Sequence, residues 1–70
     1  MVYANLRAER ARAGMTQAQV ASRVGKTVAT ISRYENGSRE LPADVLVELS
    51  DLFGCSADYL LGRTDERRRT

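Results

Sequence analysis

The chain has 70 residues, of which 43% are hydrophobic and 29% are charged, with a single cysteine and no histidine. This length allows one small domain. One cysteine excludes an intrachain disulfide and favours a reducing compartment, so we expect a cytoplasmic location. Without histidine, neither histidine-based metal sites nor Ser-His or Cys-His catalysis is available. No apolar run is long enough for a membrane helix. We therefore expect no enzymatic activity, no metal, no cofactor, no small-molecule ligand and no membrane association.

The net charge of +2 conceals an uneven distribution along the chain. Residues 1–39 carry a net charge of +5, residues 40–62 carry −5 without a single cation, and residues 63–70 carry +2. This separation indicates one half that faces a polyanion and another half that faces solvent or a partner.

Five glycines divide the chain into segments whose apolar residues have helical spacing. Because glycine favours the left-handed turn just past a helix end, this pattern predicts five helices and no strands. The predicted helices cover residues 5–13, 16–24, 27–35, about 42–53 and 57–61. We therefore expect an all-α domain over residues 1–62, followed by a charged, disordered tail over residues 63–70.

Short polar residues stand where three of these helices should begin. Thr16 with Gln19 has the spacing of a capping box, in which a hydroxyl and an amide satisfy two backbone N–H groups. Thr27 and Ser56 are suited to cap the third and fifth helices in the same way.

The second and third predicted helices are joined only by residues 25–27, so they must cross steeply. Such a unit needs a small residue where the helices touch, a left-handed turn, and apolar side chains beneath both helices. Six residues meet these needs at the expected intervals: Val20, Ala21, Val24, Gly25, Ile31 and Tyr34. The spacing over residues 17–36 is that of a DNA-binding helix-turn-helix. The alternative is a helical hairpin with no role on DNA.

Three sequence runs resemble a known family. They are Thr-Gln-x-x-apolar-Ala at 16–21, Ile-x-x-Tyr-Glu-Asn-Gly at 31–37 and Asp-Tyr-Leu-Leu-Gly at 58–62. On these runs, residues 6–62 resemble the Cro/CI-like (XRE-type) helix-turn-helix family, which includes the lambdoid phage repressors. The resemblance implies a compact five-helix, lambda-repressor-like domain whose third helix enters the major groove. It also implies a homodimer on a palindromic operator that represses or sometimes activates transcription.

We expect the outward face of the third helix to contact bases through Val28, Ala29, Ser32 and Arg33. Val28 and Ala29 can pack on a thymine methyl group, and Arg33 can fork onto guanine O6 and N7. Family members often carry hydrogen-bonding residues at the positions of Val28 and Ala29. Readout here should therefore depend more on methyl contacts and DNA shape. The alternatives are a phosphate contact for Arg33 and a Val28 that lies partly in the core.

Seven residues around the motif are expected to contact the sugar-phosphate backbone: Thr16, Gln17, Lys26, Thr27, Asn36, Ser38 and Arg39. The N-terminus of the second helix offers N–H groups and a positive dipole to a phosphate. The loop after the third helix offers N–H groups and Arg39. In the family, the residue that matches Gln17 contacts the backbone and can support the next helix. The alternatives are a Gln17 that only favours the helix and a loop that is only solvated. Arg7 is a further phosphate candidate.

Arg10 shares the predicted inward face of the first helix with Leu6 and Ala13. Glu35 stands near the end of the third helix. The matching positions in the lambdoid repressors form an ion pair, so the resemblance implies an Arg10–Glu35 pair that links the first and third helices. The alternative is two separately exposed charges.

The acidic residues 40–62 should face away from DNA, because their carboxylates would be repelled by it. Tyr59 and Leu61 are the most exposed large apolar candidates on the fifth helix, a region that forms the dimer contact in phage repressors. The alternative is a place in the core for both. Cys55 is expected to be a small buried hydrophobe. The arginines of the tail could also reach phosphates or pair with the acidic half of a second subunit.

These features predict a sequence-specific transcriptional regulator that binds double-stranded DNA as a dimeric repressor. Its half-sites should lie about one helical turn apart on one face of the duplex. The alternative is an antitoxin or another protein-interaction module, in which a protein partner binds the acidic half or the tail and DNA binding is autoregulatory.

Overall fold

The computed structural model describes residues 3–69, so residues 1 and 2 of the predicted domain and residue 70 of the predicted tail lie outside it. Within that range the chain forms five α-helices and no strand, which confirms the predicted all-α fold. The helices are α1 (Ala4–Arg12), α2 (Gln17–Val24), α3 (Val28–Asn36), α4 (Ala43–Phe53) and α5 (Ala57–Leu60). None of these described helices combines the length and the apolar character that crossing a membrane requires.

Local sequence accounts for where the helices begin and end. At the start of α2, Thr16 Oγ1 accepts the Gln19 backbone N–H at 3.1 Å, and the Gln19 side-chain oxygen accepts the Thr16 N–H at 2.8 Å. Thr27 and Ser56 cap α3 and α5 by accepting the backbone N–H three residues further on. Gly25 takes a φ of 67°, which lets the chain leave α2 and enter α3 almost at once.

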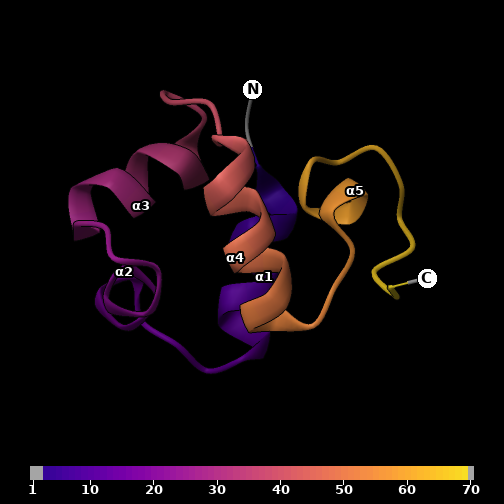
Figure 1. Ribbon diagram of the computed structural model, residues 1–70, viewed down its shortest axis with the longest axis horizontal. Helices are drawn as coiled ribbons and strands as arrows, with labels where there is room; N and C mark the ends of the chain where they lie inside the picture. Colours follow the sequence, from indigo (N-terminus) through magenta and orange to yellow (C-terminus); the bar gives the residue numbers. More distant parts are fainter. Residues whose placement is uncertain (1–2, 70) are drawn as a thin grey trace.

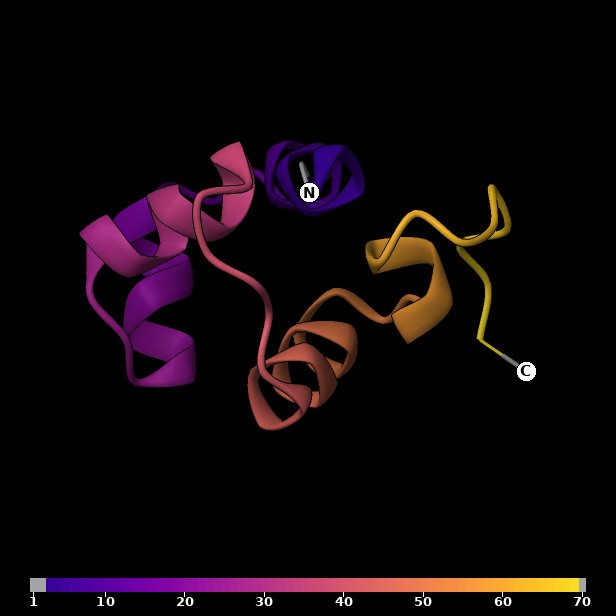
Figure 2. The same ribbon diagram turned by 90° about the horizontal axis from the view of Figure 1, so that it is seen from above.

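The helices surround one core. α2 and α3 pack together at one end of the molecule, α5 lies at the other end, and α1 and α4 lie between them (Figure 1). Figure 2 shows α1 and α4 on opposite sides of the space that the core side chains fill. The largest fully buried side chains come from every helix and from the turn before α5: Leu6, Val20, Ile31, Val45, Leu49, Cys55 and Leu60. α1 packs against both α3 and α5, so it connects the two ends.

The buried face of α1 differs from the predicted one. Tyr3, Leu6 and Glu9 are buried, whereas Arg10 is half-buried and Ala13 is exposed. The buried residues are spaced three apart, so the helix is turned toward Glu9 rather than toward Ala13. A carboxylate therefore enters the interior, where it needs a hydrogen-bonded cation.

Residues 63–69 differ from the solvated end that composition predicted. The segment turns back beside α5 (Figure 1), where the Ser56 backbone N–H donates to the Arg67 carbonyl at 2.8 Å. Ser56 Oγ also donates to the Glu66 carbonyl at 3.2 Å. The absence of apolar residues suggested that the segment could not dock. It docks through backbone and guanidinium hydrogen bonds, which need no apolar surface.

Candidate nucleic-acid interface

The interface is built on α2 and α3, which pack directly against each other and are joined by residues 25–27. The side chains that were expected beneath this unit are buried: Val20, Ala21, Val24, Ile31 and Tyr34. Because the inner side of α3 is held by this packing, the opposite side of the helix is presented to solvent in a defined orientation.

Four side chains of α3 lie on that outer side, in two pairs one helical turn apart: Val28, Ala29, Ser32 and Arg33. Val28 is 46% exposed, so it does not lie in the core. Ala29 and Arg33 are exposed, and Ser32 is half-buried. The face combines short apolar side chains with a guanidinium, which is a chemistry that can contact a thymine methyl group and a guanine edge.

Polar and cationic residues that precede α3, end it or follow it in the sequence are also exposed. They are Thr16, Lys26, Thr27, Asn36, Ser38 and Arg39. Within residues 3–69, Lys26, Arg33 and Arg39 take part in no ion pair. Their charges are therefore not neutralised by the protein itself and can attract a polyanion.

The loop after α3 is ordered by its own side chains. Asn36 Oδ1 accepts the Ser38 backbone N–H at 2.9 Å and the Ser38 hydroxyl at 2.7 Å. Gly37 ends α3 with a φ of 82°, and the Arg39 backbone N–H donates to the Arg33 carbonyl at 3.3 Å. Asn36 thus holds the turn, and Arg39 is the exposed cation that the turn presents.

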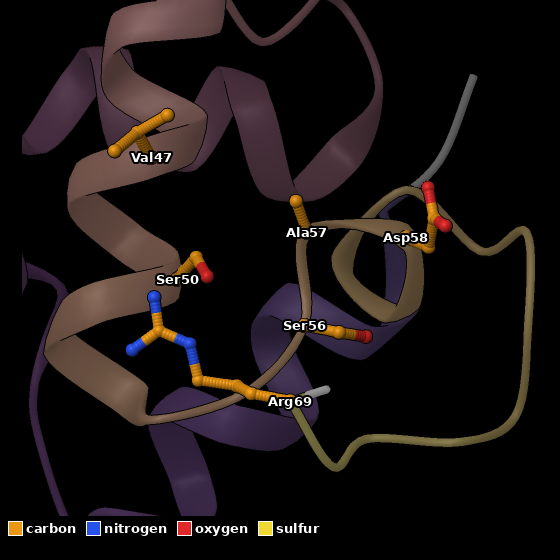
Figure 3. Close-up of a pocket in the computed structure, with 6 residues that line it drawn as sticks. All are labelled: Val47, Ser50, Ser56, Ala57, Asp58 and Arg69. Atoms are coloured by element: carbon orange, nitrogen blue, oxygen red, sulfur yellow. The ribbon is translucent and has the colours of Figure 1, made fainter.

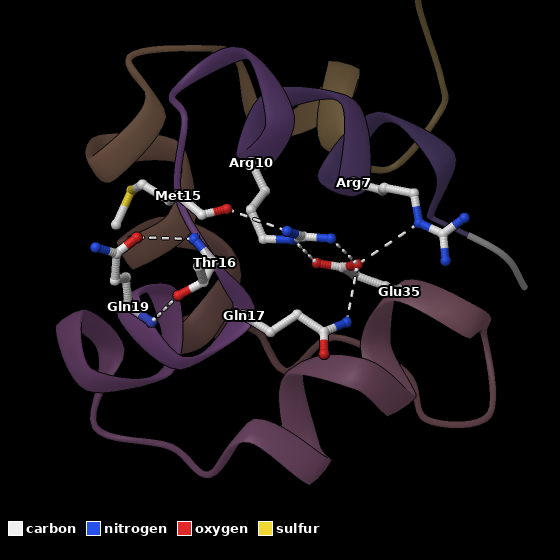
Figure 4. A network of polar contacts seen from close by, with 7 residues as sticks. All are labelled: Arg7, Arg10, Met15, Thr16, Gln17, Gln19 and Glu35. Carbon is white, nitrogen blue, oxygen red and sulfur yellow. Dashed lines mark hydrogen bonds and ion pairs between the residues drawn. The ribbon is translucent and has the colours of Figure 1, made fainter.

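Three side chains from α1 and the start of α2 converge on Glu35, which is only 3% exposed (Figure 4). Arg10 donates from Nε to Oε2 at 2.6 Å and from Nη2 to Oε1 at 3.1 Å. Gln17 Nε2 donates to Oε1 at 3.2 Å, and the exposed Arg7 lies 3.7 Å from the same oxygen. These bonds favour the charged guanidinium, so the pKa of Arg10 is raised. We call these four residues the Glu35 cluster; it ties α1 and α2 to the end of α3.

The Gln17 side chain has a partner within the protein. It is half-buried, and its amide nitrogen is aimed at Glu35. The Thr16 hydroxyl oxygen is likewise engaged by the Gln19 backbone N–H. Both side chains hold the N-terminus of α2 in place, where the helix dipole favours an anion.

The apolar surface at the opposite end differs in detail from the expectation. Tyr59 and Leu61 are half-buried and pack against the core. Within the described residues, the most exposed large apolar side chain is Val47 on α4, at 57%. It stands in an apolar run that leaves the register of the helix ambiguous. In the structure the buried apolar residues of α4 are Val45 and Leu49, four apart, and this register turns Val47 outward.

A pocket of about 390 Å³ lies beside Val47, between α4 and α5 (Figure 3). It is lined by Val47, Ser50, Ser56, Ala57, Asp58 and Arg69. Arg69 extends across it toward α4, where its Nη2 lies 2.5 Å from Asp51 Oδ1. The pocket is at the α5 end of the molecule and takes no part in the surface around α3.

Comparison with known proteins agrees with this geometry. A helix-turn-helix family model matches residues 6–60. The chain is 34% identical over 64 residues to the HTH-type transcriptional regulator ImmR of Bacillus subtilis (strain 168), covering 91% of this chain and 50% of the relative. It is 35% identical over 68 residues to the uncharacterized HTH-type transcriptional regulator YqaE of the same organism, covering 96% and 59%. The chain thus spans little more than half the length of these relatives.

A solved structure is also similar. It is the crystal structure of the P22 c2 repressor protein in complex with synthetic operator 9T, with a TM-score of 0.79 and 31% identity. The match covers 86% of this chain and 92% of that one. With the family model, the relatives and the five-helix fold in agreement, the chain belongs to the XRE-type helix-turn-helix family.

Proposed function

We propose that the chain is a sequence-specific, DNA-binding transcriptional regulator that acts in the cytoplasm as a dimeric repressor. The observation that carries this proposal is the outer face of α3, which is exposed while the other side of the same helix is locked into the core. The similar P22 c2 repressor protein was solved in complex with an operator, which supports double-stranded DNA as the ligand of this face.

In this proposal α3 enters the major groove. Arg33 hydrogen-bonds to a guanine, Val28 and Ala29 pack on thymine methyl groups, and Ser32 faces the same base edges. Contacts to the sugar-phosphate backbone come from Thr16, Gln17, Lys26, Thr27, Asn36, Ser38 and Arg39. Those of Lys26 and Arg39 are electrostatic, whereas Gln17 acts mainly by supporting the N-terminus of α2.

A homodimer would present two α3 helices to two half-sites of a palindrome, about one helical turn apart. We place the dimer contact at the end of the molecule that carries α5, around Tyr59 and Leu61. Both side chains are half-buried in the single chain, so each has surface left to bury. The exposed Val47 on the neighbouring α4 extends the apolar area there.

The experiment is a selection of bound duplexes from a randomised pool, followed by footprinting. We expect enrichment of a motif with two related half-sites whose centres lie about 10 base pairs apart. Enrichment of a single half-site would support base contacts by the outer face of α3 but would not support a dimer. Equal binding of all duplexes would overturn sequence-specific recognition.

One observation supports the alternative of a protein-interaction module. Asp44, Val47, Glu48 and Asp51 are all exposed, and their spacing places them on one stripe of α4. An apolar side chain among carboxylates suits a basic protein partner. Affinity capture of the chain from its native host tests this alternative. One stoichiometric small basic partner would favour it, and recovery of DNA alone would favour the regulator.

A further inference from the structure

Residues 63–69 are held against the domain by a bidentate ion pair. Arg67 donates from Nε and Nη2 to the two carboxylate oxygens of Glu9, at 3.1 and 2.7 Å. Its Nη2 also donates to the Phe53 carbonyl at 3.2 Å. Glu9 is only 3% exposed, and within the described part of the chain Arg67 is the one cation paired with it. A buried carboxylate without its cation is strongly unfavourable. The segment therefore supplies a charge that the interior of the domain requires.

The contacts of the segment are concentrated on a few of its residues. The carbonyls of Glu66 and Arg67 accept hydrogen bonds from Ser56, just before α5. By contrast, the Arg63 and Arg68 side chains are 72% and 81% exposed, and each lies 3.8 Å from its nearest acid. The arginines of this segment thus have different roles, although they lie close together in the sequence. Arg67 is the one that pairs with a buried carboxylate.

The ion pair is adjacent to the Glu35 cluster along α1. Glu9 and Arg10 are consecutive residues, and each is held by two hydrogen bonds, Glu9 by Arg67 and Arg10 by Glu35. α1 packs against α3 at one end of the molecule and against α5 at the other. The Arg10–Glu35 and Glu9–Arg67 pairs therefore hold α1 toward both ends of the molecule. Losing one pair would let α1 shift while the other pair still holds it.

We propose that residues 63–69 form a clasp in which Arg67 positions α1 and, through the Arg10–Glu35 pair, the reading helix α3. Arg67 is a positioning residue that strengthens DNA binding without touching DNA. This inference rests on the proposed function for its effect on DNA, whereas the clasp itself can be tested without DNA.

The first test compares Arg67→Ala with Arg68→Ala, which removes the same charge from the same segment. We expect Arg67→Ala to lower the melting temperature by several degrees, because Glu9 stays buried without a cation. Arg68→Ala should leave it unchanged. Arg67→Lys should fall between wild type and Arg67→Ala. Adding Glu9→Gln to Arg67→Ala should recover part of the loss, because a neutral amide needs no cation. Equal melting of wild type and Arg67→Ala would overturn the clasp.

Cys55 provides a second, local readout. It is the only cysteine in the sequence, it is fully buried, and it precedes Ser56, which binds the segment. If Arg67 closes the clasp, a thiol reagent such as DTNB should label Arg67→Ala about tenfold faster than wild type or Arg68→Ala in native buffer. Equal labelling rates in all three proteins would show that the segment does not restrict opening of this region.

The DNA readout uses a duplex of about 20 base pairs, titrated at several salt concentrations well below the melting temperature. Arg67→Ala should weaken binding several-fold while the salt slope stays that of wild type.

A slope that flattens by about one unit, with unchanged melting, would place Arg67 on a phosphate and overturn the proposal. Lower melting with unchanged affinity would overturn the positioning of α3. A wild-type chain that binds no duplex would overturn the proposed function, and melting and labelling would still decide the clasp.

Discussion

Glu9 and Glu35 are equally buried carboxylates, and each is held by a bidentate arginine, yet their surroundings differ. Around Glu35 three side chains converge, and the pair with Arg10 spans 25 positions of the sequence. Glu9 has one arginine, and that pair spans 58 positions. A carboxylate that several donors share is the centre of a cluster, so its own loss affects all of them. A carboxylate with a single donor depends on that donor, and here the donor lies on a segment that composition would assign to solvent.

The same contrast holds for the two ends of the molecule. At the α2–α3 end, four cations have no ion-pair partner within residues 3–69: Arg23, Lys26, Arg33 and Arg39. At the other end, the acids Asp51 and Asp58 each pair with an arginine of the segment 63–69. Unpaired cations attract a polyanion, whereas paired charges of both signs do not. Changes to the unpaired cations at the α2–α3 end should therefore alter DNA binding, whereas changes at the α5 end should alter stability.

The largest effect should come from Glu35→Ala, which removes the centre of the Glu35 cluster. Arg10 and Gln17 would lose their shared acceptor in a largely buried site, so unfolding should become easier by about 3 kcal/mol. Urea denaturation measures this loss. Glu35→Gln is the control, since it keeps an acceptor without the charge and should cost less. A Glu35→Ala midpoint equal to that of wild type would mean that the cluster does not hold α1 to α3.

Arg33→Ala should change binding rather than stability, because Arg33 is exposed on α3. We expect a loss of about 1–3 kcal/mol in binding free energy and relaxed specificity at one base pair in each half-site. Anisotropy titrations of the selected duplex and its single-base variants measure both. An equal loss on every duplex would instead assign Arg33 to a phosphate.

Arg39→Ala should weaken binding to all duplexes by a similar factor. Because Arg39 is proposed on a phosphate, the salt slope should flatten by about one unit. Arg12→Ala is the matched control. Arg12 is also an exposed arginine, but it lies beside Leu52 and Phe53, on the side of α1 that faces α4. If both variants flattened the slope alike, net charge rather than the location of Arg39 would govern binding.

The smallest effect should be on how stability depends on pH, through Cys55 beside the clasp. Burial, and then the negative charge of Glu9, raises the pKa of the Cys55 thiol. The thiol of the unfolded chain ionises near pH 8.5, so the stability gained from the neutral thiol is complete below about that pH. It is lost as the pH rises toward the folded pKa, by at most about 1.4 kcal/mol per pH unit. Cys55→Ala should remove this part of the decline in urea midpoint between about pH 8 and pH 10. An equal decline in both proteins would assign the pH dependence to other groups.

Much of the fold follows from local rules that can be read along the chain. The capping box of Thr16 and Gln19, the hydroxyl caps at Thr27 and Ser56, and the glycine turns all depend on neighbours within a few residues. The inward face of α2 and α3 follows from helical periodicity. The pairing of Arg10 with Glu35 was expected only from the family resemblance. It joins two helices that no local rule places together.

Three features could not be predicted in this way. Glu9 lies inward because α1 is short and weakly patterned, so packing against its neighbours decides its rotation. Val47 is exposed because the apolar run on α4 fits more than one register, and the core accepts only one of them. Residues 63–69 dock because a buried carboxylate 58 positions away requires Arg67.

The helices, their caps, the helix-turn-helix spacing and the separation of charge all follow from the order of the amino acids, since they depend on residue type and on interactions within a few residues. Which arginine neutralises which carboxylate follows instead from how the helices and residues 63–69 pack in space. Ion pairing depends on distance in space and on exclusion of water, and neither can be read from position along the chain.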